Sequence, residues 1–298
     1  MSPDAKTPRT VSLVLGSGGA RGLAHIGVIR WLEANGYVIQ SISGCSIGAL
    51  VGGIHAAGKL DEFEQWVRAI TRRDILSLMD ISWSKSGLLK GDRVINTLAE
   101  LVGHQTIETL PIRFTAVAAD VRHEKEVWLT SGSLFDAIRA SISLPLLLTP
   151  HLCNGVLLID GGVLNPVPIA PTFSDNTDLT LAVNLGGPVE IAPPSVPETP
   201  VASPPVSVIH EKIGGFIKRL QPEKVKSLTP DWGIYDVANQ AFDAMQSTIA
   251  RHKLAAYPPD VAIEIARNAC GTLEFDRAAE MIDLGYRKAG ESLKPLPA

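Results

Sequence analysis

Cysteine is scarce in this chain of 298 residues, which has only Cys45, Cys153 and Cys270. Because their number is odd and their spacing is wide, the sequence predicts neither a disulfide framework nor a pair of metal-ligating thiols. Such cysteine usage fits a reducing compartment best, and we expect a cytoplasmic protein. The sequence also lacks a carboxylate cluster with the spacing of calcium ligands, so we expect no metal and no other cofactor.

Basic residues are also few, since 27 lysines and arginines stand against 31 aspartates and glutamates, for a net charge of −4. A nucleic-acid-binding surface needs a basic stripe, so this balance argues against a nucleic acid partner. The chain has no apolar run of about 18 residues, the length of a membrane span, and its polar segment 1–10 lacks the pattern of a signal peptide. We expect a soluble protein, for which peripheral contact with a membrane stays open and the oligomeric state is not indicated.

Apolar residues, in contrast, make up 45% of the chain and suffice for a sizeable core. Strand-like and helix-like stretches alternate, which favours an α/β fold with a largely parallel central sheet. We expect one domain with a core over residues 11–175 and a C-terminal part over residues 176–298. The expected strands are 11–15, 38–43, 113–119, 126–130, 156–159, 179–184 and 261–265. The expected helices are 23–33, 49–57, 60–70, 92–102, 134–141 (with Ser133 as its N-cap), 234–251 and 275–288.

Proline gathers between residues 188 and 205, where seven prolines exclude a helix or a central strand. We interpret this stretch as an exposed loop, either an inert spacer or a lid. After it, apolar residues recur on one face of an expected helix over residues 208–220, which carries two lysines and an arginine at its polar positions. This helix either docks on the core or contacts a membrane surface.

The first of two glycine-rich turns follows the expected strand 11–15 and spans Gly16 to Gly22. Its backbone N–H groups can hold a negative charge, as an oxyanion hole does. A dinucleotide-binding turn requires an acidic residue at the end of the second strand, and residues 38–43 contain none. The Gly-Lys-Ser/Thr ending of a phosphate-binding loop is missing too, so the sequence disfavours nucleotide binding.

The second turn, Gly44-Cys45-Ser46-Ile47-Gly48, places a serine between two glycines at an expected strand-to-helix junction. Such an elbow lifts the hydroxyl out of the sheet, and glycines at Gly44 and Gly48 leave room for its tight backbone. The helix that follows adds its positive end near a developing negative charge. The pattern indicates a nucleophile, and a glycine-rich turn without chemistry is the alternative.

A serine hydroxyl needs a base beside it to act as a nucleophile. A catalytic triad whose serine, acid and histidine follow in this order along the chain would need a histidine after Asp160. The candidates are His210, beyond the proline-rich stretch, and His252, at the expected end of a helix. Neither is placed like the histidine of a catalytic triad. Asp160 itself ends the apolar strand 156–159, at the kind of edge where open α/β sheets present their ligands. The sequence therefore favours Asp160 as the base, and a merely turn-forming aspartate is the alternative.

Four blocks, in this order, resemble the patatin-like phospholipases, in particular their bacterial and neuropathy-target-esterase-type branch. The blocks are Ser17-Gly18-Gly19-Ala20-Arg21-Gly22, Gly44-Cys45-Ser46-Ile47-Gly48, Ala140-Ser141-Ile142-Ser143-Leu144-Pro145 ending in Pro150, and Asp160-Gly161-Gly162 with Asn165-Pro166-Val167-Pro168. The resemblance extends from residue 11 to residue 286. It implies a three-layer α/β/α fold whose site is a Ser-Asp dyad.

The resemblance implies that Ser46 is the nucleophile and that Asp160 is its base, without a histidine. It implies that Gly18 and Gly19 donate backbone N–H groups to the oxyanion. The remaining residues carried over are Ala20 and Arg21 in the oxyanion loop, Gly44 and Gly48 in the elbow, and Gly161 and Gly162 after the base.

The same resemblance gives expectations for three further residues, Ser17, His25 and Asp120, and the position of Cys45 beside Ser46 gives one for a fourth. Ser17 stands where the family usually has glycine, so its side chain either crowds the loop or donates one more hydrogen bond. His25 is expected to pack rather than react, and Asp120 is expected to serve structure. Cys45 is expected to lie beneath the elbow as a small apolar residue.

The activity that the resemblance implies is the hydrolysis of a lysophospholipid or another acyl ester through an acyl-enzyme, as part of lipid degradation. An acyltransferase, an esterase for non-lipid acyl groups and a non-catalytic lipid-binding regulator are the alternatives. Because an ordinary carboxylate titrates near a pH of about 4, an aspartate base predicts activity that persists below a pH of about 6.

Overall fold

The computed structural model describes residues 9–78, 89–190 and 234–293. The chain divides into a main unit, residues 1–190 with 242–298, and a second unit, residues 191–241. The proline-rich stretch from residue 191 on and the expected helix 208–220 lie outside the described residues, so both stay predictions. The boundary expected at residue 175 also stays a prediction.

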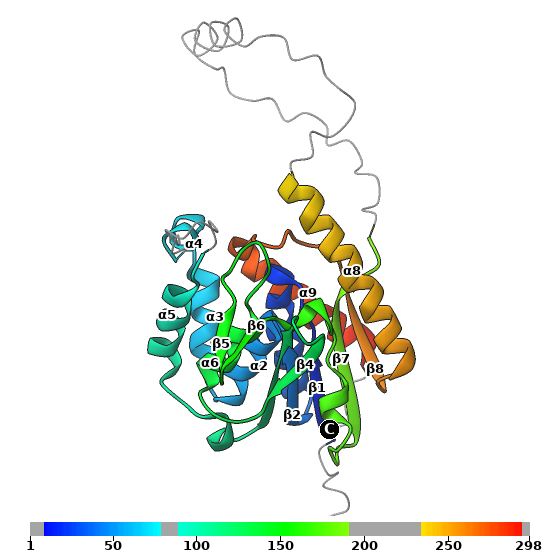
Figure 1. Ribbon diagram of the computed structural model, residues 1–298. Helices are drawn as coiled ribbons and strands as arrows, with labels where there is room; N and C mark the ends of the chain where they lie inside the picture. Colours follow the sequence, from blue (N-terminus) through cyan, green and yellow to red (C-terminus); the bar gives the residue numbers. More distant parts are fainter. Residues whose placement is uncertain (1–8, 79–88, 191–233, 294–298) are drawn as a thin grey trace, which may run out of the picture. The chain divides into compact units, whose positions relative to one another are not determined.

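The main unit is built on a central sheet, in which the described residues form eight strands (Figure 1). The strands are β1 Thr10–Leu15, β2 Val38–Cys45, β3 Arg113–Asp120, β4 Lys125–Leu129, β5 His151–Cys153, β6 Val156–Asp160, β7 Leu179–Gly187 and β8 Val261–Ala266. Their order is β5-β6-β3-β2-β1-β7-β8, with β4 also paired to β3. The strands β3, β2, β1, β7 and β8 run parallel to one another. The pairs β3–β4, β3–β6 and β5–β6 are antiparallel. These pairings confirm an α/β fold with a largely parallel sheet.

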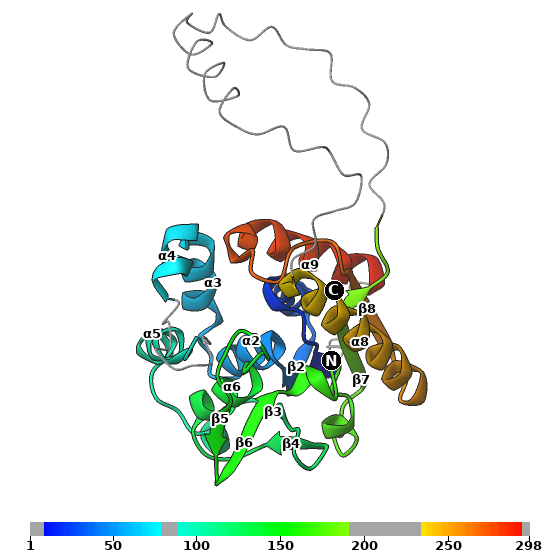
Figure 2. The same cartoon turned by 45° about the horizontal axis from the view of Figure 1, so that its top comes forward.

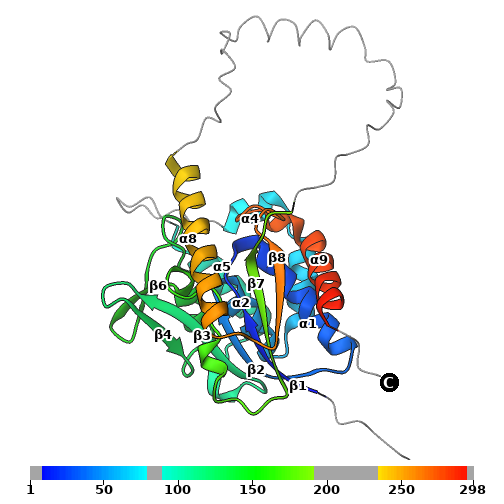
Figure 3. The same cartoon turned by 90° about the vertical axis from the view of Figure 1, so that its right-hand side faces the viewer.

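Helices cover both faces of the sheet, and the alternation of side chains along β1 shows why. Leu13 and Leu15 belong to the larger core, which includes Ile29, whereas Val14 packs with Ala250 on the opposite face. Figure 3 shows α8 on one side of β7 and β8, and α1 with α9 on the other. The described helices are α1 Ala24–Ala34, α2 Ile47–Ala56, α3 Leu60–Ala69, α4 Arg72–Leu78, α5 Asp92–Val102, α6 Leu134–Ser141, α8 Ile234–Ala256 and α9 Ala278–Ser292. The expected three layers are confirmed.

Most expected elements lie within a few residues of their predicted ends. The N-cap of α6 is confirmed, because Ser133 Oγ accepts a hydrogen bond from the Asp136 amide at 3.2 Å. The helix expected at residues 49–57 begins earlier, at Ile47, because the chain passes from the serine turn directly into α2. The elements α4 and β5 were not predicted, since seven and three residues are too few to show a clear periodicity.

Candidate active site

The serine turn is a strained junction between β2 and α2. Ser46 has φ 56° and ψ −125°, a conformation that non-glycine residues rarely adopt and that is typically held in place at functional sites. A Cβ atom on Gly44 would lie 2.5 Å from the Gly48 carbonyl oxygen, and one on Gly48 would lie 2.1 Å from the Leu15 carbonyl oxygen. Both positions therefore require glycine, since the backbone approaches them too closely for any side chain.

The Ser46 hydroxyl donates a hydrogen bond to Asp160 Oδ2, although the two residues lie 114 positions apart in the chain. Both side chains are buried, and the Asp160 carboxylate is fully shielded from solvent. The Gly162 amide donates to the other carboxylate oxygen at 2.7 Å, so the turn after Asp160 fixes the orientation of the carboxylate. A carboxylate in this position can accept the serine proton directly.

Asp160 reaches the site by a different route from the one that the sequence suggests. Asp160 ends β6, which runs antiparallel to β3, so it does not lie at the end of a parallel strand. Figure 2 shows β6 beside β3, with β5 beyond it. The hairpin between β5 and β6 reverses the chain, and Asp160 pairs with Ala118 near the end of β3. The carboxylate therefore reaches the carboxyl edge of the parallel strands from the opposite direction.

Burial changes the acidity of Asp160. Removal of its carboxylate from water raises its pKa to about 6, and hydrogen bonds from Ser46, Gly162 and Cys45 offset part of this rise. The expectation of an ordinary carboxylate, which titrates near a pH of about 4, is therefore wrong. The sequence could not show that the side chain at residue 160 is removed from water.

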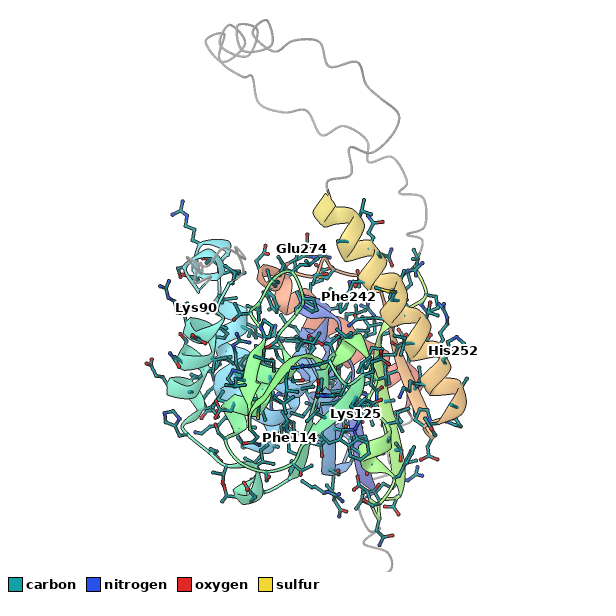
Figure 4. The ribbon with its side chains drawn as sticks, viewed as in Figure 1. Lys90, Phe114, Lys125, Phe242, His252 and Glu274 are labelled. Carbon is teal, nitrogen blue, oxygen red and sulfur yellow. The ribbon has the colours of Figure 1, made fainter. Side chains whose placement is uncertain are left out.

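Of the two histidines considered as alternative bases, the structure describes His252 alone. His252 lies on α8 and is exposed (Figure 4). His210 lies outside the described residues. Among the described residues, no histidine forms a hydrogen bond with Ser46 or Asp160.

In the glycine-rich loop after β1, two backbone amides have no acceptor among the residues that the structure describes. The Ser17 amide donates to the Pro166 carbonyl at 2.8 Å, and the Ala20 amide donates to the Thr272 carbonyl at 2.9 Å. Within the described part of the chain, the amides of Gly18 and Gly19 between them have no hydrogen-bond acceptor. Ala20 thus tethers the loop, and Gly18 and Gly19 are the amides that remain available to an oxyanion.

The Arg21 side chain contacts α8 and the segment that follows β8. Its buried guanidinium donates to the carbonyl oxygens of Arg267 and Cys270 at 3.0 and 3.3 Å and pairs with Asp243 of α8 at 3.3 Å. Through these contacts Arg21 links the loop after β1 to the segment after β8, and its role in shaping an oxyanion loop stays a prediction.

Two supporting side chains were missed in the sequence. Ser141 Oγ accepts a hydrogen bond from the Ser46 amide at 2.9 Å and donates to the Val117 carbonyl at 2.6 Å, which fixes the backbone of the serine turn. Gln246 of α8 donates to Ser17 Oγ at 3.1 Å. Ser141 falls inside one of the four sequence blocks and could have been suspected, whereas a lone helical glutamine gave no signal.

The contact with Gln246 shows where the Ser17 side chain lies. A Cβ atom on Gly162 would lie 2.3 Å from Gln246 Nε2 and 2.6 Å from Ser17 Oγ, so these three residues touch one another. The Ser17 side chain is therefore accommodated between α8 and the turn after Asp160. It lies between the glycine-rich loop after β1 and the turn after Asp160.

The remaining expectations concern residues beside the site. His25 is fully buried, its Nε2 donates to the Gly16 carbonyl at 2.9 Å, and burial lowers its pKa to about 4, so it packs as a neutral ring. Asp120 accepts hydrogen bonds from the His123 ring and amide at 2.7 and 3.2 Å and orders the turn after β3. Cys45 lies buried beneath the elbow with its sulfur 3.9 Å from Asp160 Oδ1, and burial raises the pKa of its thiol.

An apolar pocket with a volume of about 200 Å³ opens at Ser46. Its walls come from α2, α3, α5, the segment 142–148 and the segment 272–275, and Ser46, Thr272 and the indole of Trp66 supply its polar side-chain atoms. The other residues that line it are Gly19, Leu23, Ile47, Leu50, Phe63, Val67, Ile70, Ile75, Leu89, Gly91, Val94, Leu98, Ile142, Leu144, Leu147, Leu148, Leu273 and Phe275. The sequence did not reveal this pocket, because its walls are far apart along the chain.

Comparisons with known proteins match the chain to a family model and to several relatives. A model of the family described as patatin-like phospholipase matches residues 13–173. An uncharacterized NTE family protein of Mycobacterium tuberculosis is 40% identical over 97% of this chain and 92% of its own length. Lysophospholipase NTE1 of Pyricularia oryzae is 27% identical over 97% of this chain, which corresponds to 19% of that protein.

Among solved structures, the crystal structure of VipD from Legionella pneumophila is similar, with a TM-score of 0.47 and 13% identity, over 96% of this chain and 67% of that one. In the described ranges, none of the helices has both the length and the apolar character required to cross a membrane.

Proposed function

The chain belongs to the patatin-like phospholipase family and is a carboxylic ester hydrolase of lipids, and we propose that Ser46 is its nucleophile and Asp160 its general base. The observation that carries this proposal is the hydrogen bond between the Ser46 hydroxyl and the buried Asp160 carboxylate at the head of an apolar pocket. A hydroxyl, a base and free amides beside one another are the parts that acyl transfer requires.

In the proposed mechanism, Ser46 Oγ attacks the ester carbonyl while Asp160 Oδ2 accepts its proton. The amides of Gly18 and Gly19 stabilise the negative charge that develops on the carbonyl oxygen. Asp160 then returns the proton to the leaving alcohol, and an acyl-enzyme forms on Ser46. Water, activated by the same carboxylate, hydrolyses the acyl-enzyme and regenerates the serine.

The pocket favours a long apolar acyl group as the part of the substrate that is recognised. Its lining offers almost no polar partner, so a polar acyl group would lose its hydrogen bonds to water without replacing them. One relative is named a lysophospholipase, and a single acyl chain fits a single pocket. We therefore propose lysophospholipids or similar acyl esters as substrates, ahead of a non-lipid esterase.

We expect kcat/KM for nitrophenyl esters to rise at least about tenfold between the acetyl and octanoyl groups, since each buried methylene contributes up to about 0.8 kcal/mol. Val94→Trp, which places a large side chain in the pocket wall, should remove much of this preference and spare the acetyl ester. Asn96→Trp, on the exposed face of the same helix, is the matched control. A flat profile in the wild-type protein, together with no release of fatty acid from lysophosphatidylcholine, would contradict the lipid substrate.

We expect a second signature in the pH dependence. Because Asp160 must be ionised to accept a proton and its pKa is raised to about 6, kcat/KM for a soluble ester should fall as the pH drops through about 6. The loss should approach tenfold per pH unit below that point. Initial rates in overlapping buffers, with circular dichroism as a check on folding, measure it. Full activity at a pH of about 4.5 would be incompatible with this base.

A further inference from the structure

The rim of the apolar pocket exposes a leucine in a strained conformation. Leu144, Leu147 and Leu148 line the pocket, whereas Leu146 between them is 63% exposed. Its φ of 68° lies in the left-handed region, which leucine rarely adopts. Unlike other exposed apolar side chains of the described surface, this leucine lies beside residues that line an apolar pocket, where contact with an apolar phase would remove it from water.

A lysine lies on the neighbouring segment of the same rim. The Leu89 amide donates to the Leu147 carbonyl and the Thr149 amide to the Leu89 carbonyl, both at 2.9 Å, so the two segments lie side by side. Lys90, labelled in Figure 4, is exposed, while Leu89 and Gly91 on either side of it line the pocket. Each of the two rim segments thus carries an exposed side chain next to residues that line the pocket, a cation on one segment and a leucine on the other.

The buried Arg139 holds this rim in place from below. Its guanidinium donates to the carbonyl oxygens of Lys90 and Thr149, and also to the Ser143 hydroxyl at 2.6 Å. The two rim segments are therefore tied to one another and to the end of α6. An ordered rim keeps Leu146 and Lys90 at fixed places around the pocket mouth.

Building on the function proposed above, we propose that Leu146 and Lys90 bind the surface of a phospholipid bilayer. Leu146 would enter the acyl layer, and the Lys90 ammonium would be attracted to the head groups of anionic lipids. Since Leu144, Leu147 and Leu148 continue the apolar surface inward to Ser46, an acyl chain would pass from the bilayer to the pocket without crossing water.

Leu146→Asn tests the apolar contact, because asparagine has a similar size and tolerates the left-handed backbone, so the variant should fold. Phe173→Asn is the matched control, since Phe173 is 60% exposed. It lies close in the chain to Asp175, which pairs with Arg113 at the amino end of β3. Sedimentation with phosphatidylcholine vesicles should show binding about 10- to 100-fold weaker for Leu146→Asn, the contribution of one buried leucine. Phe173→Asn should bind as the wild type does.

Lys90→Gln tests the charge. We expect binding to weaken by roughly fivefold on vesicles that contain phosphatidylglycerol, with no change on vesicles of phosphatidylcholine alone. Equal effects on both vesicles would mean that Lys90 does not contact anionic lipid.

Activity assays separate this inference from the proposed function. Leu146→Asn should keep wild-type rates on a soluble short-chain nitrophenyl ester and lose most of its rate on a lysophospholipid dispersed in vesicles. A wild-type protein that binds no vesicles, or a Leu146→Asn variant that binds them as the wild type does, would overturn the inference even if hydrolysis is normal. A wild-type protein that hydrolyses neither ester would instead refute the proposed function. The comparison of vesicle binding would still decide whether Leu146 and Lys90 bind the bilayer.

Discussion

Ser46→Ala should abolish ester hydrolysis, with a fall in kcat on the order of 10⁵-fold or more, because the proposed covalent step takes place on this hydroxyl. The Ser46 amide keeps its hydrogen bond to Ser141 Oγ in this variant, so the elbow should keep its shape. Hydrolysis of a soluble nitrophenyl ester and of lysophosphatidylcholine measures the loss.

The control for Ser46→Ala is its folding. Its melting temperature should stay near that of the wild type, since only a hydroxyl is removed and the strained backbone of residue 46 is held by its neighbours. A folded variant that retains wild-type activity would show that the nucleophile lies elsewhere.

Asp160→Asn should be nearly as damaging, with a loss on the order of 10⁴-fold in kcat, because an amide cannot accept the serine proton. Raising the pH should not rescue it, since asparagine does not titrate. Asp120→Asn is the matched control: this aspartate binds His123 and touches neither Ser46 nor Asp160. Equal losses in the two variants would argue against a specific role for Asp160.

The same substitution should raise stability at neutral pH. The pKa of Asp160 is raised from 3.8 to about 6 in the folded chain, so the fold binds the proton more tightly than the unfolded chain does. The wild type therefore loses about 3 kcal/mol of unfolding free energy as the pH rises from about 4 to about 6, and Asp160→Asn does not. Its melting temperature should exceed that of the wild type at a pH of about 8, with the gap closing toward a pH of about 4. Equal melting temperatures of the two proteins at both pH values would mean that ionisation of Asp160 does not destabilise the fold.

The parts of the site that depend on local backbone chemistry could be predicted from the sequence. The glycines of the serine turn are required by contacts with residues only a few positions away or on the adjacent strand β1, so the motif carries its own geometry. That the short glycine-rich loop between β1 and α1 offers backbone amides likewise follows from its sequence, and among the described residues the amides of Gly18 and Gly19 have no acceptor. Helix signals were also local, as the Ser133 cap shows.

The parts that depend on distant packing could not be predicted. The direction of β6 is set by its hairpin with β5, a strand of three residues that shows no periodicity. The pKa of Asp160 follows from its burial, and the position of Ser17 depends on Gln246, which is 229 residues away. Each of these features arises from a tertiary contact that leaves no pattern in the sequence around either partner.

The dyad itself is tested most directly by the rate at which a fluorophosphonate, an electrophile that captures activated serines, modifies the protein, with mass spectrometry of the peptides to locate the adduct. We expect a single adduct on Ser46, formed at least about 10³-fold more slowly in Asp160→Asn and at the wild-type rate in Asp120→Asn. An adduct on another residue, or an undiminished rate in Asp160→Asn, would contradict the assignment of Ser46 and Asp160.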